Sequence, residues 1–351
     1  LATAWQVSPD GLKYSFKLRP GVKFHDGHDF TAEDVRYSVL TQKKQGPRGR
    51  ITLANVERVD TPDPLTAVIV LSRPAPFLLK SLSSAELPIG PAHRYSDGEP
   101  LGNPNITAPV GTGPFVFEQW VRGSHLVLRK NPNYWRKGYP HLDRVIVKFV
   151  RDPAAISTAV ETGEVDVAQG VGLADLERLA GNPKLKVDDT YDGFLNNASF
   201  LEFNVDNPVL ANPKVRHAIA QAIDRNFIRN TIYYKRVEVV NSPIPRVLSD
   251  YYDDSTFRYP FDVAAANRLL DEAGQPKQAN GQRFSLRLSY IPGAEFKRTT
   301  DYLRSALARV GIKVEVVDGD LPTFLKHVYS TRDFDINING LGRLFDPTVG
   351  V

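Results

Sequence analysis

The strongest indication of the fold lies in residues 284–317, which read FSLRLSYIPGAEFKRTTDYLRSALARVGIKVEVV. A strand-like run covers Phe284 to Tyr290, a helical pattern extends from about Glu295 to Gly311, and a second strand-like run covers Ile312 to Val317. A strand, a helix and a strand in succession are typical of parallel pairing through a crossover. This stretch therefore predicts an α/β unit whose sheet is largely parallel.

Helices and strands keep alternating on both sides of this stretch. Helices are predicted at 262–273 and 322–329, and a strand at 334–339. Two earlier helices, 153–163 and 213–233, each begin at an Asp-Pro or Asn-Pro pair, where the acidic or amide side chain caps the helix and proline fits its first turn.

The first 110 residues have a different pattern, rich in hairpins. Residues 12–18 alternate between apolar and polar after a Pro-Asp-Gly turn, which predicts a half-buried antiparallel strand. Thr31 and Asp34 form a capping pattern, and Phe30 and Val35 occupy the two positions of a hydrophobic staple, so a helix is expected to begin there. Further strands are predicted at 66–71, 115–120, 125–130 and 145–150.

Composition limits the class of protein. A chain of 351 residues with 42% hydrophobic content is long enough for two or three packed units. The 44 basic and 40 acidic residues are spread along the chain, which argues against a nucleic-acid partner. The absence of cysteine excludes disulfides, thiolate metal sites and cysteine nucleophiles. No apolar run reaches the roughly 18 residues that would cross a bilayer.

Signatures of catalysis and cofactor binding are missing from the sequence. It contains no Gly-x-Ser-x-Gly elbow, His-Glu-x-x-His helix, P-loop or EF-hand loop, and Gly170-Val171-Gly172 lacks the third glycine of a dinucleotide site. His25 and His28 flank Asp26-Gly27 and are possible metal ligands, but a turn between a strand and a helix explains the same polar residues. We therefore expect no cofactor and no metal site.

Several motifs together carry a family resemblance. They are FKLRPGVKFHDG (16–27), TAEDV (31–35), GTGPF (111–115), RKNPNYW (129–135), GEVD (163–166), VRHAIAQAIDR (215–225), GIKV (311–314), FDIN (334–337) and the pair Asp346-Pro347. In this combination the chain resembles the extracellular solute-binding proteins of ABC transporters, in the large peptide/nickel-binding family that includes oligopeptide and dipeptide receptors. The resemblance covers essentially the whole chain.

The resemblance implies a two-lobed periplasmic-binding-protein fold of the α/β class, class II-like, with an extra hairpin-rich α+β subdomain. The implied regions are 1–110 for that subdomain, 111–225 for the core of the first lobe and 226–351 for an incomplete second lobe. Family members carry segments before the motif LATAW (1–5) and after Asp346-Pro347 that this sequence lacks. The chain is therefore expected to be truncated at both ends.

The predicted ligand contacts lie mainly where the strand at 334–339 ends. Glycines there let the backbone approach a solute, and Tyr290 ends a neighbouring strand in the same way. In peptide-binding relatives an Asp in this loop pairs with the peptide's α-amino group, whereas Leu344 falls near that slot here. Arg343 suits a carboxylate or phosphate, with an exposed surface arginine as the alternative. The expected contacts are Gly340, Leu341, Gly342, Arg343, Asp346, Tyr290 and the aromatic Phe194.

The function implied is that of a receptor rather than an enzyme. It would capture a peptide or a peptide-like small polar solute in a cleft between the lobes and deliver it to a membrane permease. It is expected to be a monomer, in the periplasm or lipid-anchored on the outer face of the membrane. The alternatives are a receptor of the same family for an opine, an oligosaccharide or a metal chelate, and, outside the family, a hydrolase.

Overall fold

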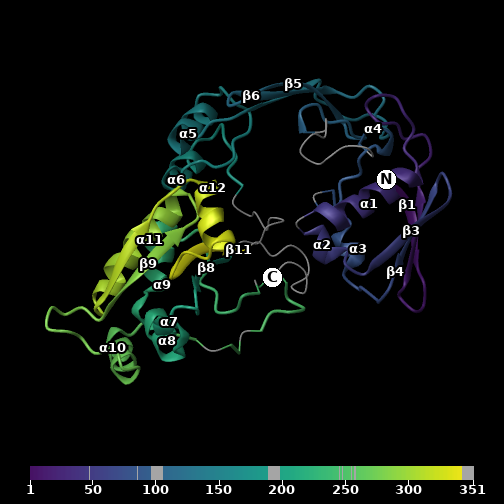
Figure 1. Ribbon diagram of the computed structural model, residues 1–351. Coiled ribbons are helices and arrows are strands. Elements are labelled where there is room, and N and C mark those ends of the chain that lie inside the picture. Colours follow the sequence, from purple (N-terminus) through teal and green to yellow (C-terminus); the bar gives the residue numbers. More distant parts are fainter. Residues whose placement is uncertain are drawn as a thin grey trace. The chain divides into compact units, whose positions relative to one another are not determined.

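The computed structural model of the protein is shown in Figure 1. It describes residues 1–46, 48–84, 86–95, 106–188, 198–244, 246, 248–253, 255–256 and 258–341. The chain divides into two compact units, unit 1 (Leu1–Gly170) and unit 2 (Val171–Pro347). In the described residues, unit 1 has two sheets and unit 2 has one, and each unit has its own apolar core.

The first sheet of unit 1 is antiparallel and four-stranded, in the order β1-β2-β4-β3. Its strands are β1 (Ala2–Val7), β2 (Lys13–Leu18), β3 (Val56–Asp63) and β4 (Thr66–Leu71). The predicted turn between β1 and β2 is present: Gly11 adopts a φ of +68° and its N–H donates to the carbonyl of Ser8. Tyr14, Phe16 and Leu18 of β2 are buried, which confirms the alternation seen in the sequence.

The predicted capping pattern begins helix α1 (Ala32–Gln45). One oxygen of the Asp34 carboxylate accepts from the backbone N–H of Thr31 at 2.8 Å, and the other accepts from the N–H of Ala92 at 2.8 Å. The buried Asp34 therefore joins the start of α1 to the start of a second helix, far away in the sequence. The short helices of unit 1 are α2 (Gly49–Thr52), α3 (Leu78–Ser81) and α4 (Ala92–Tyr95).

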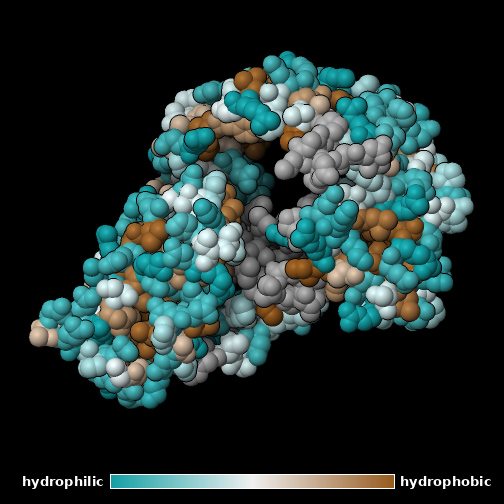
Figure 2. Space-filling model, viewed as in Figure 1, coloured by the Kyte–Doolittle hydropathy of each residue, from teal (hydrophilic) through white to brown (hydrophobic). Residues whose placement is uncertain are grey.

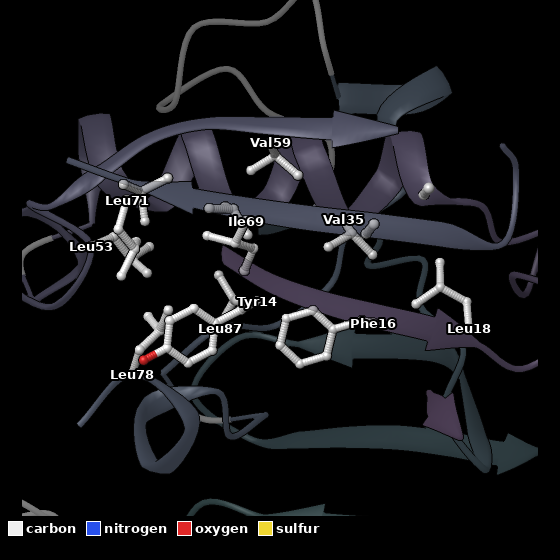
Figure 3. Packing of buried hydrophobic residues seen from close by; sticks show 14 of the residues in the cluster. Tyr14, Phe16, Leu18, Val35, Leu53, Val59, Ile69, Leu71, Leu78 and Leu87 are labelled. Atoms are coloured by element: carbon white, nitrogen blue, oxygen red, sulfur yellow. The ribbon is translucent and has the colours of Figure 1, made fainter. Parts of the chain in front are cut away.

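The core of unit 1 lies between this sheet and its helices. Figure 3 shows side chains from three of its strands converging with Val35 of α1 and Leu78 of α3 in one apolar cluster. Ile69 of β4 is only 1% exposed and Leu78 is fully buried. Burial of such side chains contributes about 1.5–3 kcal/mol each relative to full exposure.

The second sheet of unit 1 is an antiparallel meander in the order β5-β6-β7. It consists of β5 (Phe115–Val121), β6 (His125–Lys130) and β7 (Arg144–Lys148), and α5 (Pro153–Glu161) follows. Gly123 turns the hairpin with a φ of +76°, and Asp152 caps α5 by accepting from the N–H of Ala155 at 2.7 Å. The predicted hairpin and helix are confirmed.

Unit 2 is built on a mixed four-stranded sheet in the order β10-β9-β11-β8. Its strands are β8 (Ala198–Phe203), β9 (Phe284–Tyr290), β10 (Ile312–Val317) and β11 (Ile336–Leu341). β9 pairs in parallel with both β10 and β11, whereas β8 pairs antiparallel with β11. The parallel pairing predicted from residues 284–317 is therefore confirmed.

The helical elements of unit 2 supply the rest of its core. They are η3 (Leu173–Asp175), α6 (Leu176–Ala180), α7 (Pro208–Ala211), α8 (Pro213–Ala222), α9 (Arg225–Phe227), η4 (Ile228–Ile232), α10 (Val263–Glu272), α11 (Ala294–Ala308), α12 (Leu321–Leu325) and η5 (Lys326–Ser330). Leu286 and Leu288 of β9 pack in one buried cluster with side chains of α8, α10 and α11. The buried Arg283 directly precedes β9, and its guanidinium donates to the carbonyl of Val310 at 2.9 Å.

One detail differs from the sequence predictions. The helix predicted over 213–233 is interrupted: Ile223 is extended, with φ −103° and ψ 117°, and Asp224 caps a new turn by accepting from Asn226 and Phe227. The two compact units divide near residue 170, and β8, which precedes residue 225, pairs with β11 in the sheet of unit 2. The expected region boundaries at 110/111 and 225/226 stay predictions.

The surface shown in Figure 2 is mostly hydrophilic, with apolar side chains gathered in several patches. Exposed apolar side chains occur in both units, for example Trp5 at 61% and Leu142 at 63% exposure in unit 1. Several of those in unit 1 lie on or beside its second sheet: Trp120, Val121, Leu142, Ile146, Val147, Phe149 and Val150. In the part of the chain that the structure describes, no helix has the length and apolar character needed to cross a membrane.

Candidate functional site

The carboxyl ends of three parallel strands meet at one edge of the sheet of unit 2. Tyr290 ends β9, Asp318 directly follows β10, and Gly340 lies near the end of β11. The parallel register that aligns β9 with β10 and β11 brings these ends together. In open α/β sheets, ligands bind outside this edge of the strands. The structure therefore brings together two of the residues expected at the site, Tyr290 and Gly340.

Tyr290 is held in place by an acidic partner. Its hydroxyl donates to Oδ1 of Asp318 at 2.7 Å, and the N–H of Gly319 donates to the same oxygen at 2.9 Å. Burial, together with the hydrogen bond to Asp318 and the charges of Asp318 and Asp301, raises the pKa of Tyr290 to about 12. The phenol is therefore protonated at neutral pH. Its ring packs in the apolar cluster, so the hydroxyl rather than the ring is the part that serves a polar partner.

Gly340 leaves a small space beside an aromatic side chain. A Cβ atom added at this position would lie 3.6 Å from Cζ of Phe296, which is ordinary van der Waals contact. The N–H of Gly340 donates to Oδ1 of Asn339 at 2.8 Å. A β-carbon would therefore fit at this position beside the Phe296 ring.

Two residues that sequence reasoning missed also lie at this edge. Nδ2 of Asn339 donates to the hydroxyl of Tyr329, a side chain that is 59% exposed on η5. The ring of Tyr329 is placed edge-on to Phe324, with centroids 6.3 Å apart. Residues 336–339 alternate between isoleucine and asparagine in the sequence. Because successive strand residues point to opposite faces, this alternation predicts that Asn337 and Asn339 lie on the face opposite the two isoleucines. It is the signal in the sequence that could have identified Asn339.

Neighbouring residues of β11 and β9 carry two buried atoms without a hydrogen-bond partner among the described residues. Nδ2 of Asn337 donates to Oε2 of Glu202 at 3.0 Å, but Oδ1 of Asn337 has no partner among the described residues. Ser289 is the register neighbour of Asn337 on β9, and its Oγ also lacks a described partner. Buried polar groups are usually paired, so this pair of strands retains unused hydrogen-bonding capacity.

The other predicted contacts are not described to the same extent. Leu341 ends β11 and pairs in register with Ala198 of β8. Gly342, Arg343, Asp346 and Phe194 lie outside the described residues. Their roles stay predictions.

In unit 1, His25 joins two motifs that are far apart in the sequence. The N–H of Gly111 donates to Nδ1 of His25 at 3.2 Å, so Nε2 carries the proton and donates to the carbonyl of Gly113 at 3.0 Å. Burial lowers the pKa of His25, and the charge of Arg129 lowers it further, against the opposing effects of Gly113 and Asp26. This neutral histidine therefore links residues 111–113 to the turn that follows Phe24.

A cavity of about 380 Å³ lies beside His25 in the same unit. It is lined by Tyr37, Ser38, Thr41 and Gln42 of α1 and by Phe115, Phe117 and Leu128 of the second sheet, among others. Nearby, Asp26 and His28 lie against His93 of α4. His25, which flanks Asp26-Gly27 together with His28 in the sequence, does not join this cluster.

Comparison with known sequences defines the family. Residues 1–350 match the sequence model of the bacterial extracellular solute-binding proteins, family 5, middle. The chain belongs to this family. The resemblance read from the motifs is thereby confirmed, and with it the periplasmic-binding-protein fold of the α/β class, which solved relatives share.

Three relatives illustrate the range of this solute-binding family. A Brucella ovis protein with a provisional name as an ABC transporter peptide-binding protein is 30% identical over 99% of this chain and 66% of its own length. The periplasmic binding protein DppA of Helicobacter pylori, solved with the peptide STSA, has a TM-score of 0.85 and 27% identity over 99% of this chain and 70% of that one. AgaA of Agrobacterium tumefaciens, solved with agropinic acid, has a TM-score of 0.79 and 30% identity over 97% and 67% of the two chains. The chain thus spans about two thirds of the length of its relatives.

Proposed function

We propose that this chain belongs to a receptor that captures a peptide or a peptide-like small polar solute and delivers it to an ABC permease. The observation that carries the proposal is the match of residues 1–350 to a family of extracellular solute-binding proteins. A relative whose structure was solved in complex with the peptide STSA supports a peptide as the solute. The receptor would act as a monomer, in the periplasm or lipid-anchored on the outer face of the membrane.

The proposed contact surface is the carboxyl edge of the sheet in unit 2. Asp318 is exposed and negatively charged, so it suits a cationic group such as the α-amino group of a peptide. The hydroxyl of Tyr290 already donates to Asp318 and keeps a lone pair for a donor on the solute. The exposed ring of Tyr329, whose hydroxyl accepts from Asn339 of β11, offers an apolar surface. Together these groups supply hydrogen bonds that orient a solute and an apolar surface that contacts it, as small-molecule sites require.

The chain is proposed to bind its solute without changing it. A hydrolase needs a nucleophile, a base and a group that orients the base, and the sequence has none of the spacings that mark such sets. Tyr290 is also unsuited to acid–base chemistry near neutral pH, because its pKa is raised to about 12.

A receptor for an opine-type solute is the second candidate. The observation in its favour is that the relative solved with agropinic acid is 30% identical over 97% of this chain. The same edge of unit 2 would serve such a solute, because hydroxyl, amide and carboxylate groups recognise polar solutes of several classes.

The test is incubation of the purified protein with a peptide library and with agropinic acid, followed by native mass spectrometry. A retained and intact peptide supports the proposal, and retention of agropinic acid alone supports the second candidate. Cleaved peptides without any retained solute would contradict both.

The contact surface is tested separately by calorimetry with the retained solute. Tyr290→Phe removes one hydroxyl and should weaken binding about three- to tenfold, as expected for the loss of one hydrogen bond. The matched control is Tyr302→Phe, which removes a hydroxyl bonded to the backbone of Asp224 elsewhere in unit 2 and should leave the affinity unchanged. Equal affinities of all three proteins would place the solute elsewhere.

A further inference from the structure

Asp26, His28 and His93 form a compact cluster on unit 1. Nε2 of His93 lies 2.9 Å from Oδ2 of Asp26, and Nδ1 of His28 lies 3.3 Å from Oδ1 of the same carboxylate. The two imidazole rings are stacked, with centroids 4.0 Å apart and planes 27° from parallel. One potential ligand atom of each residue lies within 4.8 Å of the other two.

The backbone fixes the part of this cluster that contains Asp26 and His28. Asp26 and His28 sit in a tight turn: the N–H of Phe24 donates to the carbonyl of His28 at 2.8 Å, and Gly27 has a φ of +93°. The N–H of His28 also donates to Oδ1 of Asp26 at 3.3 Å. The cluster is therefore assembled on a turn whose geometry the chain itself specifies.

His93 is positioned independently of that turn. It is on α4, whose first residue, Ala92, donates to the buried Asp34 at 2.8 Å. The ring of Phe24 lies edge-on to the His93 ring, with centroids 5.9 Å apart. Because Asp34 also caps α1, the position of His93 is tied to the core of unit 1.

The donor set suits a borderline divalent transition metal. Two neutral imidazoles and one carboxylate are typical ligands of zinc, and imidazole favours Zn²⁺, Ni²⁺ and Cu²⁺ over Mg²⁺ and Ca²⁺. In a tetrahedral site with metal–ligand distances of about 2.0–2.1 Å, neighbouring ligand atoms are separated by roughly 3.3 Å. The His93 and His28 nitrogens lie 2.9 and 3.3 Å from different oxygens of the Asp26 carboxylate, and one ligand atom from each of the three residues lies within 4.8 Å of the others, so small side-chain shifts bring the three to this spacing.

The surroundings leave room for an ion. The side chains of His28, His93 and Asp26 are 63%, 32% and 22% exposed, so water and a metal have access to them. The nearby cation Lys23 is paired with Asp29 at 2.7 Å, which neutralises its charge.

We propose that Asp26, His28 and His93 form a binding site for a divalent transition metal, with Zn²⁺ as the test ion and water completing the coordination. Such an ion joins the turn at residues 24–28 to α4 and stabilises unit 1. The proposal does not depend on solute capture, because it rests only on side chains of unit 1.

The test is calorimetry of the full chain, stripped of metal with a chelator, titrated with Zn²⁺. The wild-type protein should bind one equivalent, whereas Asp26→Asn, His28→Ala and His93→Ala should each raise the Kd at least about tenfold, since even outer partners of metal ligands contribute about 10–100-fold. The matched control is His141→Ala, which removes an exposed histidine of unit 1 outside the cluster and should leave the Kd unchanged. Mg²⁺ should not bind.

Thermal melting followed by tryptophan fluorescence gives a second measurement. Zn²⁺ should raise the melting temperature of the wild-type protein and of His141→Ala but not that of the three cluster variants. His28→Ala is the safest variant for folding, because the His28 side chain is largely exposed. Absence of saturable Zn²⁺ binding to the wild type, or an equal Kd in all variants, would show a hydrogen-bonded surface cluster only and overturn the proposal.

Discussion

The antiparallel sheet of unit 1 and the mixed sheet of unit 2 use their strands differently. In β2 buried and more exposed residues alternate, so this strand has one face on the core and the other toward solvent, whereas most residues of its neighbour β4 are buried. In β9 the last three residues, Leu288 to Tyr290, are all buried, because both faces of that strand are covered. The parallel strands of unit 2 also end at a common edge, where polar side chains collect. This common edge is where we propose that unit 2 contacts the solute, and we propose no such contact for the first sheet of unit 1.

The largest expected effects come from matched core substitutions in the two units. Ile69→Ala in unit 1 and Leu288→Ala in unit 2 each create a cavity and should lower the free energy of unfolding by about 2–5 kcal/mol. All three tryptophans, Trp5, Trp120 and Trp135, are in unit 1, so their fluorescence reports on that unit alone. Chemical denaturation followed by fluorescence and by far-ultraviolet circular dichroism measures both effects.

The comparison predicts different signatures for the two variants. Ile69→Ala should shift the fluorescence transition, whereas Leu288→Ala should shift only the circular dichroism transition. Coincident shifts of both signals in both variants would show that the two cores unfold as one, which would contradict the description of two independent cores.

A smaller effect concerns acid stability of unit 1. Because burial lowers the pKa of His25, the unfolded chain binds the proton more readily than the folded one. The contribution of His25 is therefore present above the ordinary histidine pKa of about 6.5 and is lost as the pH falls through the lower, folded value. Fluorescence-detected melting from about pH 7.5 to about pH 5 should show this loss, and His25→Gln should flatten the profile. An unaltered pH profile in His25→Gln would assign the acid sensitivity to another group.

The smallest effect is expected at alkaline pH in unit 2. The pKa of Tyr290 is raised to about 12 by burial and by Asp318, so its contribution to stability is present below the ordinary tyrosine value of about 10 and is lost as the pH rises toward 12. The difference in phenolate absorbance between the wild type and Tyr290→Phe isolates this group. It should titrate near pH 12, and a transition near pH 10 would mean that the hydroxyl is not held by Asp318.

Local features of the fold could be predicted from the sequence because neighbouring residues determine them. The Thr31–Asp34 capping pattern and the alternation in residues 12–18 depend only on short-range contacts, and both are confirmed. The parallel pairing of β9 and β10 also follows from one strand–helix–strand segment. The break at Asp224 was missed although an aspartate is a good helix cap, because the apolar periodicity continues across it.

Contacts between distant segments could not be predicted in the same way. His93 meets Asp26 across 67 positions, and Gly113 meets His25 across 88. Nothing in the local pattern around His93 distinguishes it from an exposed helix residue. At the candidate site, the positions of Tyr290 and Gly340 followed from the strand pattern, whereas the roles of Asp318 and Tyr329 depend on how the segments pack.

The most direct test of the central claim, that the carboxyl edge of unit 2 contacts the solute, is hydrogen–deuterium exchange with the peptide retained from the library. Binding should slow exchange in segments that contain Asp318 and residues 329–341, because their amides become shielded or rigid. The sheet of β1 to β4 in unit 1 should exchange at the same rate with and without the peptide. Protection confined to unit 1, with no change at Asp318 or at residues 329–341, would contradict the account.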